Sequence, residues 1–367
     1  MPYTLALTYN LKPETPPAGA SEDAYSEFDS RATVQAIAEA LRAHGHHVYL
    51  VDATPDLPAW FRTHQVDLVF NIAEGVCGDA RESHVPAILD FLGVPYTGSG
   101  VLSLALALDK AKAKQLFRDA GIPTPPFQLV TDPDAPLDPT LRFPLMVKPN
   151  REGSAKGIWA SSVVLDHAGA SAQIRRVMAR YDQPVLIEEF IEGTELTVGI
   201  LGNEPPRALP VLEIDFASCT GSGERFYSWR MKEYQGQARL HLTPTFWCPA
   251  RLPGSVMAEV QRVALVAHQV LGCREFSRVD VRLGQEGRPS VLEVNPLPGL
   301  DPTESNYPRM AREAGIDYPD LIGRLVELAA ARVRLGSEAP ALWEDRNAPV
   351  AFAIGGMTTL WSSRGGR

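Results

Sequence analysis

Hydrophobic and polar positions alternate with two different periods along the first hundred residues. Four short apolar runs are bounded by polar or turn-forming residues and predict buried strands, at residues 5–9, 48–51, 66–71 and 95–97. In residues 30–44 and 83–92, apolar side chains recur every three or four positions, which predicts amphipathic helices. Strands that alternate with helices in this way predict a parallel, doubly wound sheet of an α/β protein, with ligands at the carboxyl ends of the strands.

Beyond Asp109 the pattern becomes that of mixed α+β lobes. The predicted helices span residues 110–120, 168–181, 255–271 and 318–335. The predicted strands span residues 145–148, 158–160, 185–189, 278–283 and 290–294. The chain has 367 residues, which is too long for one small core and fits two or three lobes.

Composition narrows the classes of protein that this chain can belong to. The formal net charge of -9 argues against a nucleic-acid partner, which would need clustered positive charge. The first ten residues lack the basic region of a signal peptide, and no apolar stretch approaches the ~20 residues of a membrane helix. The four cysteines are scattered and lack a CxxC spacing, so we expect reduced thiols in a cytoplasmic protein without a membrane partner.

The strongest chemical signal is a pair of predicted strands with polar residues at alternate positions. Alternation along a strand places Arg278 and Asp280 on one face, and likewise Glu293 and Asn295. Two carboxylates and an amide oxygen suit Mg²⁺, and an arginine beside the metal can stabilise developing negative charge. The alternative is that these are two edge strands with solvated charges.

A second signal is Lys148 at the end of an apolar strand, followed by a glycine-bearing turn at residues 153–157. Backbone amides in such a turn can hold phosphate oxygens while the lysine supplies positive charge. The alternative is an ordinary hairpin turn. The sequence contains no Walker A motif, no HExxH and no GxSxG, so P-loop, zinc-peptidase and hydrolase assignments find no support.

A competing motif is the segment Gly98-Ser99-Gly100, which follows a short predicted strand as a dinucleotide fingerprint would. Asp119 lies near the spacing of the acidic residue of that fingerprint. However, Ser103 stands where a third glycine or alanine belongs, and the motif lies late in the chain. An NAD-binding role is therefore the weaker alternative.

Taken together, these residues resemble the ATP-grasp enzymes of the D-alanine–D-alanine ligase type. The resemblance runs from about residue 70 to 324, and its blocks stand in the family's order at residues 93–100, 109–110, 147–154, 188–193, 248–250, 278–281 and 292–295. It implies an ATP-grasp fold with an N-terminal pre-ATP-grasp domain (1–109), a small lid subdomain (110–188) and a C-terminal catalytic subdomain (189–335). The tail (336–367) has no assigned role. It also implies ATP and two Mg²⁺ ions as cofactors, with Mn²⁺ as the alternative metal.

The resemblance also implies a role for individual residues. The nucleotide would be bound by Lys110, Lys148, Gly153 and Ser154 at its phosphates, by Glu188, Glu189, Phe190 and Ile191 at adenine, and by Glu195 at the ribose. The metal ions would be bound by Asp280, Glu293 and Asn295. Catalysis would involve Arg278 and the backbone of Gly299 at the oxyanion, and Lys232 on a mobile loop.

The implied reaction joins a carboxylate to an amine through an acyl-phosphate, between small-molecule substrates and within a homodimer. The sequence departs from the family where the first substrate binds: Glu74 stands in place of a histidine, and Arg81 is a new charge. Glu27 is the candidate for the glutamate that holds the first amine, and Ser305 for the residue that receives the second carboxylate. We expect a first substrate other than D-alanine; the alternatives are a divergent D-alanine–D-alanine ligase and a non-catalytic nucleotide-binding protein.

Overall fold

The computed structural model describes residues 2–220, 223–235 and 237–335, and the chain up to Val333 forms one compact unit. The predicted tail at 336–367 lies outside the described residues. The division of the remaining chain at residues 110 and 189 stays a prediction. Among the helices of the described residues, none is long and apolar enough to cross a membrane.

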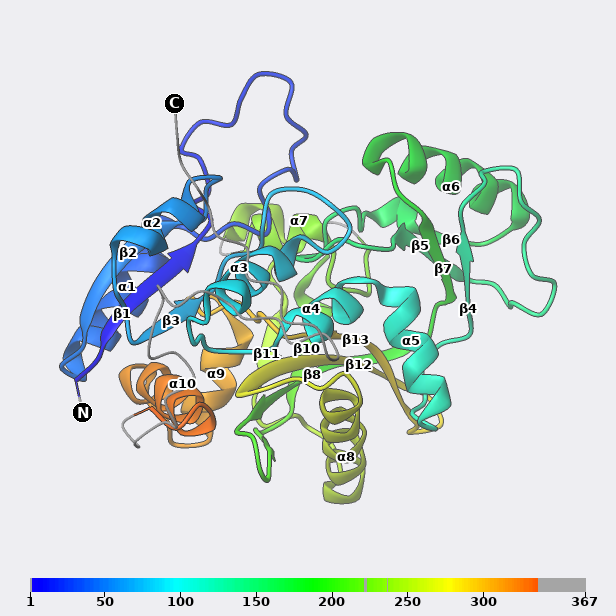
Figure 1. Ribbon diagram of the computed structural model, residues 1–367. Coiled ribbons are helices and arrows are strands. Elements are labelled where there is room, and N and C mark those ends of the chain that lie inside the picture. The colour runs from blue at the N-terminus through cyan, green and yellow to red at the C-terminus, as the bar shows by residue number, and fades with distance from the viewer. Residues whose placement is uncertain (1, 221–222, 236, 336–367) are drawn as a thin grey trace, which may run out of the picture. The chain divides into compact units, whose positions relative to one another are not determined.

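The N-terminal region forms the parallel sheet that its alternating pattern predicts. Its strands lie in the order β2-β1-β3 and are β1 (Thr4–Tyr9), β2 (His47–Asp52) and β3 (Leu68–Asn71). The predicted strand at 95–97 is reduced to one bridge between Tyr96 and Val69. The helices of this region are α1 (Arg31–Ala43), α2 (Leu57–Thr63) and α3 (His84–Leu92). Apolar side chains of α2 and α3 share a core with the sheet, while α1 packs on β2 and on α10 (Tyr318–Arg332) (Figure 1).

A small antiparallel sheet follows, in the order β4-β7-β5-β6. Its strands are β4 (Phe127–Val130), β5 (Leu145–Pro149), β6 (Val163–Val164) and β7 (Val185–Glu189). Helix α6 (His167–Tyr181) covers one face by packing against Leu145, Val147 and Ile187. Since side chains alternate along a strand, Met146, Lys148 and Glu188 point to the opposite face.

The predicted strand at residues 158–160 is wrong. Ala160–Ser162 form a 3-10 turn, and the partner of β5 begins only at Val163. The hydroxyl of Ser162 accepts a hydrogen bond from the backbone N–H of Trp159 at 3.0 Å. The Trp159 ring lies 4.8 Å from that of Trp229. The apolar run therefore serves a tertiary aromatic contact rather than a sheet.

The largest sheet contains the two strands with the predicted chemistry. Its main order is β11-β10-β8-β12-β13, with β9 paired to β8. The strands are β8 (Gly193–Leu201), β9 (Arg207–Ala208), β10 (Leu212–Asp215), β11 (Thr245–Trp247), β12 (Phe276–Gly284) and β13 (Pro289–Asn295). The helices packed on one face are α4 (Val101–Leu108), α5 (Lys110–Asp119) and α8 (Gly254–Val270) (Figure 1). The polar residues of β8 and β12 lie on the opposite face of this sheet. The two helices not yet named are α7 (Trp229–Glu233) and α9 (Asn306–Glu313).

The glycine-serine turn that could have held a dinucleotide is filled by the chain itself. The backbone N–H of Gly98 donates to the carboxylate of Glu275 at 2.6 Å. The hydroxyl of Ser99 accepts from the N–H of Arg274 at 3.1 Å, and that of Ser103 donates to the carbonyl of Gly272 at 2.7 Å. These bonds fasten α4 to the segment before β12, so the motif has a structural explanation.

Candidate active site

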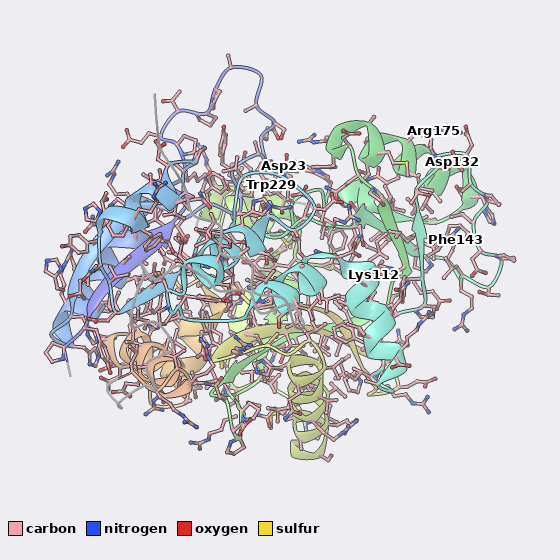
Figure 2. The ribbon with its side chains drawn as sticks, in the orientation of Figure 1. Asp23, Lys112, Asp132, Phe143, Arg175 and Trp229 are labelled. Carbon is pink, nitrogen blue, oxygen red and sulfur yellow. The ribbon has the colours of Figure 1, made fainter. Side chains whose placement is uncertain are left out.

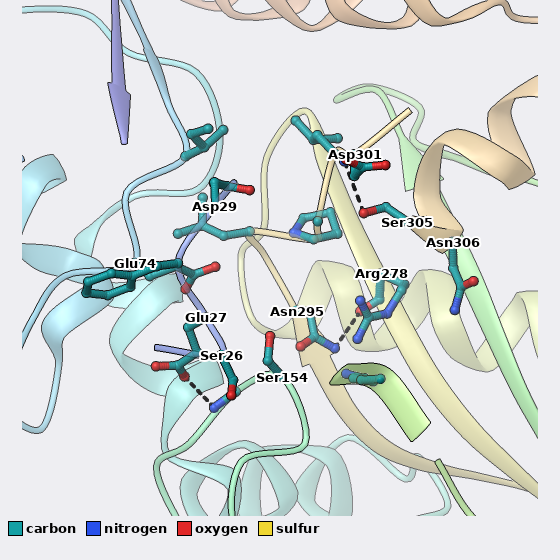
Figure 3. Close-up of a pocket in the computed structure, with 18 of the residues that line it drawn as sticks. Ser26, Glu27, Asp29, Glu74, Ser154, Arg278, Asn295, Asp301, Ser305 and Asn306 are labelled. Carbon is teal, nitrogen blue, oxygen red and sulfur yellow. Dashed lines mark hydrogen bonds between the residues drawn. The ribbon is translucent and has the colours of Figure 1, made fainter. Parts of the chain in front are cut away.

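Two adjoining cavities lie over the free faces of the small and large sheets. We call the first the inter-sheet cavity; its lining includes Met146, Lys148 and Glu188 from the small sheet and Glu195, Asp280 and Arg282 from the large one. The second, the acidic cavity, is lined by residues of the N-terminal region, of the turn 296–305 and of the 152–154 loop (Figure 3). The residues shared by both cavities are Tyr227, Lys232, Arg278, Glu293 and Asn306. The two spaces therefore meet at a group of cationic and acidic side chains.

Lys148 is held at the inter-sheet cavity by a buried carboxylate. Its ammonium lies 2.6 Å from Glu188 Oε1, and Lys114 contacts the other oxygen of Glu188 at 2.8 Å. Burial opposes the charge of each group, but the two lysines lower the pKa of Glu188. Lys114 has no exposed side-chain surface and also donates to Thr124 at 2.7 Å. Glu188 thus positions Lys148, whereas sequence reasoning had placed Glu188 at the adenine and had missed Lys114.

The segment after β7 connects the two sheets. Glu189 lines the inter-sheet cavity, and its carboxylate pairs with Arg142 at 3.3 Å. Arg282 lies 4.8 Å from the Phe190 ring and donates to the carbonyl of Ile191 at 3.0 Å. Arg282 also pairs with Glu195 at 3.1 Å. Arg282 thereby positions both the segment after β7 and the carboxylate predicted to hold a ribose.

The alternation predicted for the two chemical strands is confirmed. Arg278 lies directly across from Asn295, and Asp280 from Glu293. The guanidinium of Arg278 forms two hydrogen bonds to Asp280, at 2.9 and 2.7 Å, and Asn295 Nδ2 donates to Asp280 at 3.1 Å. Lys110 lies 3.2 Å from Glu293. Although burial opposes ionisation, Lys110 and the neighbouring cations hold the pKa of Glu293 well below its ordinary range.

The donor chemistry of this hairpin fits a hard divalent cation. Asp280 and Glu293 supply carboxylate oxygens, and the amide nitrogen of Asn295 is turned toward Asp280, which leaves its oxygen for a cation. No group of three or more histidine, cysteine, aspartate or glutamate residues is arranged to hold a metal within the described part of the chain. A metal held here would therefore have to complete its coordination with phosphate oxygens or water.

The loop after β5 closes toward the N-terminal region. Ser154 and Ala155 have φ angles of 48° and 57°, in the left-handed region that non-glycine residues rarely adopt. The N–H of Gly153 donates to Glu27 Oε1 at 2.6 Å, and Lys110 donates to the carbonyl of Glu152 at 2.5 Å. Ser154 lines the acidic cavity. Residues predicted to hold phosphates therefore come together beside Glu293.

Lys232 lines both cavities and lies on helix α7, which contacts the N-terminal loop. Trp229 donates to the hydroxyl of Ser26 at 2.6 Å, and Glu233 pairs with Lys12 at 2.9 Å. Figure 2 labels Trp229 and also Asp23, which belongs to the same N-terminal loop as Ser26. Burial and the neighbouring Arg278 lower the pKa of Lys232 to about 8. The lysine is thus partly neutral near physiological pH.

Of the residues predicted for the first substrate, two reach the acidic cavity and one supports them. Glu27 and Glu74 line the cavity (Figure 3). Arg81 does not line it; its side chain is 8% exposed and contacts Glu27 at 2.5 Å and Glu152 at 3.2 Å. Glu82, which sequence reasoning missed, also lines the cavity. The sequence did not mark Glu82, because a single carboxylate in a short turn before a helix belongs to no recognisable motif.

The turn after β13 forms the far wall of the acidic cavity. A Cβ at Gly299 would lie 2.8 Å from Ser305 Oγ, so a side chain there would displace this hydroxyl. Ser305 Oγ accepts from the N–H of Asp301 at 3.0 Å (Figure 3). Asn306, also missed from the sequence, faces both cavities, and its Oδ1 is buried without a hydrogen-bond partner among the described residues.

Known proteins match most of this chain. The family model described as D-ala D-ala ligase C-terminus matches residues 116–327. A D-alanine–D-alanine ligase of Pelotomaculum thermopropionicum is 37% identical over 82% of this chain and 92% of its own length. That of Halalkalibacterium halodurans is 39% identical over 82% and 94%. The crystal structure of D-alanine–D-alanine ligase from Bacillus anthracis complexed with ATP has a TM-score of 0.70 and 25% identity, and covers 90% of this chain and 98% of that one.

The matches extend over the small sheet, the large sheet and the helices that support them. The solved relative also matches the predicted fold class, an α/β ATP-grasp fold with a parallel N-terminal sheet. The chain belongs to the D-alanine–D-alanine ligase family of ATP-grasp ligases, which form carbon–nitrogen bonds.

Proposed function

We propose that this ligase joins the carboxylate of one amino acid, or of another small acid, to the amine of a second amino acid at the expense of ATP. The observation that supports the proposal most strongly is the meeting of the two cavities at Lys232, Arg278 and Glu293. A nucleotide in the inter-sheet cavity would direct its phosphates to this junction. An acid in the acidic cavity would reach the same point from the other side.

The proposed reaction has two steps. A carboxylate oxygen attacks the γ-phosphorus, the bond to ADP breaks, and an acyl-phosphate forms. The amine then attacks the acyl carbon, phosphate leaves, and the nitrogen loses a proton. Lys110, Lys148 and the Gly153–Ser154 amides would hold phosphate oxygens, while Arg278 and the backbone of Gly299 would stabilise the tetrahedral oxyanion. The rate enhancement would come from positioning and charge neutralisation rather than from a side-chain nucleophile.

Mg²⁺ is the metal that the oxygen donors fit, with Mn²⁺ as the alternative. Asp280, Glu293 and Asn295 would hold it. When bound, it would neutralise phosphate charge and orient the phosphate oxygens. A homodimer remains a prediction from the family resemblance.

Two substrate assignments differ at the acidic cavity. D-Alanine at both positions is favoured by the names of the relatives, which are D-alanine–D-alanine ligases. A different first substrate is favoured by Glu74 and Glu82, whose carboxylates line the cavity and do not suit a small apolar side chain. We favour the second assignment.

The test is an assay of Mg²⁺-dependent release of ADP and phosphate from ATP, screened over pairs of D- and L-amino acids. Mass spectrometry would identify the condensed product. The proposal predicts phosphate release only when a carboxylate donor and an amine acceptor are both present. Tight ATP binding without cleavage, for every pair, would instead indicate a non-catalytic nucleotide-binding protein.

A further inference from the structure

The N-terminal wall of the acidic cavity carries more carboxyl groups than the protein pairs with cations. Glu27 is paired with Arg81. Asp29, Glu74 and Glu82 also line the cavity, and among the described residues none of the three has an ion-pair partner. Figure 3 shows Glu27, Asp29 and Glu74 on one side of the cavity and Arg278 on the other.

The nearby cations are already engaged elsewhere. Lys12 pairs with Glu233 at 2.9 Å, and Lys110 pairs with Glu293 at 3.2 Å. Arg81 divides its charge between Glu27 and Glu152, which themselves line the cavity. The three unpaired carboxylates therefore face the space that a substrate would fill.

Glu82 is the most informative of these groups. Only 7% of its surface is exposed, it lines the cavity, and among the described residues no hydrogen bond or ion pair engages its carboxylate. A buried carboxylate without a partner is costly, and a ligand that supplies a positive charge removes that cost.

The titration of the empty cavity agrees with this geometry. Burial and the adjacent Glu27 raise the pKa of Glu82 to about 8. Burial and the adjacent Glu82 raise the pKa of Glu74 well above its ordinary value. The raised pKa values favour protonated carboxyl groups in the empty cavity, and a bound cation would favour the carboxylates and so release protons to the solvent.

Resting on the ligase function proposed above, we propose that the amino acid that donates its carboxylate carries a second positive charge. This charge is an amino or guanidino group on the side chain, and it is held between Glu74 and Glu82. Glu27 is left for the α-amine, and the carboxylate of the same molecule points toward Arg278 and the junction of the cavities. A neutral aliphatic side chain would leave the carboxylates protonated and without a partner.

The test compares lysine with norleucine, which lacks only the side-chain ammonium, using both enantiomers of each. In the ligase assay, kcat/KM for lysine as carboxylate donor should exceed that for norleucine by at least about tenfold, the worth of one charge-assisted hydrogen bond. Glu74→Gln and Glu82→Gln should remove this preference and leave the affinity for ATP unchanged. Glu39→Gln, which removes an exposed carboxylate on α1 that lines neither cavity, should retain the preference.

A binding measurement keeps the inference falsifiable without turnover. Titration calorimetry in the presence of Mg²⁺ and a non-hydrolysable ATP analogue, in buffers of different ionisation enthalpy, should show protons released on binding of lysine and none with norleucine. Equal binding of the two amino acids would overturn the inference. Condensation of neutral amino acids at full rate would also overturn the inference, but it would be consistent with the proposed ligase function. Failure of every pair of amino acids to cleave ATP would contradict the ligase function itself.

Discussion

Lys148 and Lys114 contact the same buried carboxylate, but Lys148 lines the inter-sheet cavity and Lys114 has no exposed side-chain surface. The sequence marked Lys148, because it ends an apolar strand before a glycine-bearing turn. It could not mark Lys114, which lies in a helix rich in lysine and becomes distinct only when α5 packs against the small sheet.

This pair provides a matched test of nucleotide binding. Lys148→Met should raise the Kd for ATP by roughly 10- to 100-fold, since it removes one charge-assisted contact to a phosphate. Lys114→Met should leave that Kd within a small factor, although both variants lose stability by leaving Glu188 with one partner. Calorimetric titration with ATP and thermal unfolding would separate the two effects. Equal weakening of ATP binding by both substitutions would contradict the role of Lys148.

Arg278 is the residue placed to act on the reacting atoms. Arg278→Ala should lower kcat by about 10² to 10³, as removal of an oxyanion donor does in other acyl transfers, with a small change in the KM for ATP. Arg278→Lys should retain part of the activity because it keeps the charge but loses the fork that contacts Asp280. A loss confined to the KM for ATP would show that Arg278 binds nucleotide instead.

At the scale of elements, the hairpin of β12 and β13 was predictable because a strand's period of two fixes which side chains share a face. The same reasoning failed at residues 158–160, where Trp159 packs on Trp229 rather than into a sheet. Short elements such as α2 and β4 were also missed, because seven or fewer residues hold too little periodicity. Local patterns thus predicted the longer helices and several strands, but did not delimit β8, whose last six residues are all buried.

Helix α7 has the contacts of a lid that shields an acyl-phosphate from water. Trp229 connects it to both Ser26 and Trp159. Trp229→Ala should therefore raise the ratio of phosphate released to amide formed above one, because water would compete with the amine. Trp247→Ala, on β11 and 41% exposed, should leave the ratio at one. The ratio follows from a phosphate assay and quantitative mass spectrometry of one reaction; a ratio of one in both variants would contradict the role of the lid.

At the scale of the molecule, the acidic cavity makes stability depend on pH. Burial and the neighbouring Asp301 raise the pKa of Asp29 from 3.8 to about 7. The folded state then keeps a proton that the unfolded state releases, so Asp29 costs stability progressively as pH rises from about 4 to about 7.

Asp29→Asn should therefore stabilise the ligand-free protein at pH 8 and have little effect near pH 4. Urea unfolding at both pH values measures the difference, and Asp119→Asn, an exposed carboxylate on α5, is the control. A gain in stability at pH 4 as large as that at pH 8 would show that packing rather than charge is responsible.

The whole fold was more predictable than the substrate site. Hydrophobic periods and the family resemblance together predicted the parallel N-terminal sheet and the ATP-grasp fold. The acidic cavity, in contrast, combines a loop near Glu27, the end of β3 and the turn after β13. Side chains that meet only through tertiary packing, such as Glu82 and Asn306, leave no local pattern in the sequence.

The most direct test of the proposed reaction follows one oxygen atom. A carboxylate donor labelled with ¹⁸O in both carboxylate oxygens should transfer one labelled oxygen to each released phosphate, because the acyl-phosphate expels phosphate with the donor's oxygen attached. The products would be ADP and an amide that retains the other label. Phosphate without label would show hydrolysis of ATP by water, and label in AMP would show an acyl-adenylate; either result would contradict the proposed reaction.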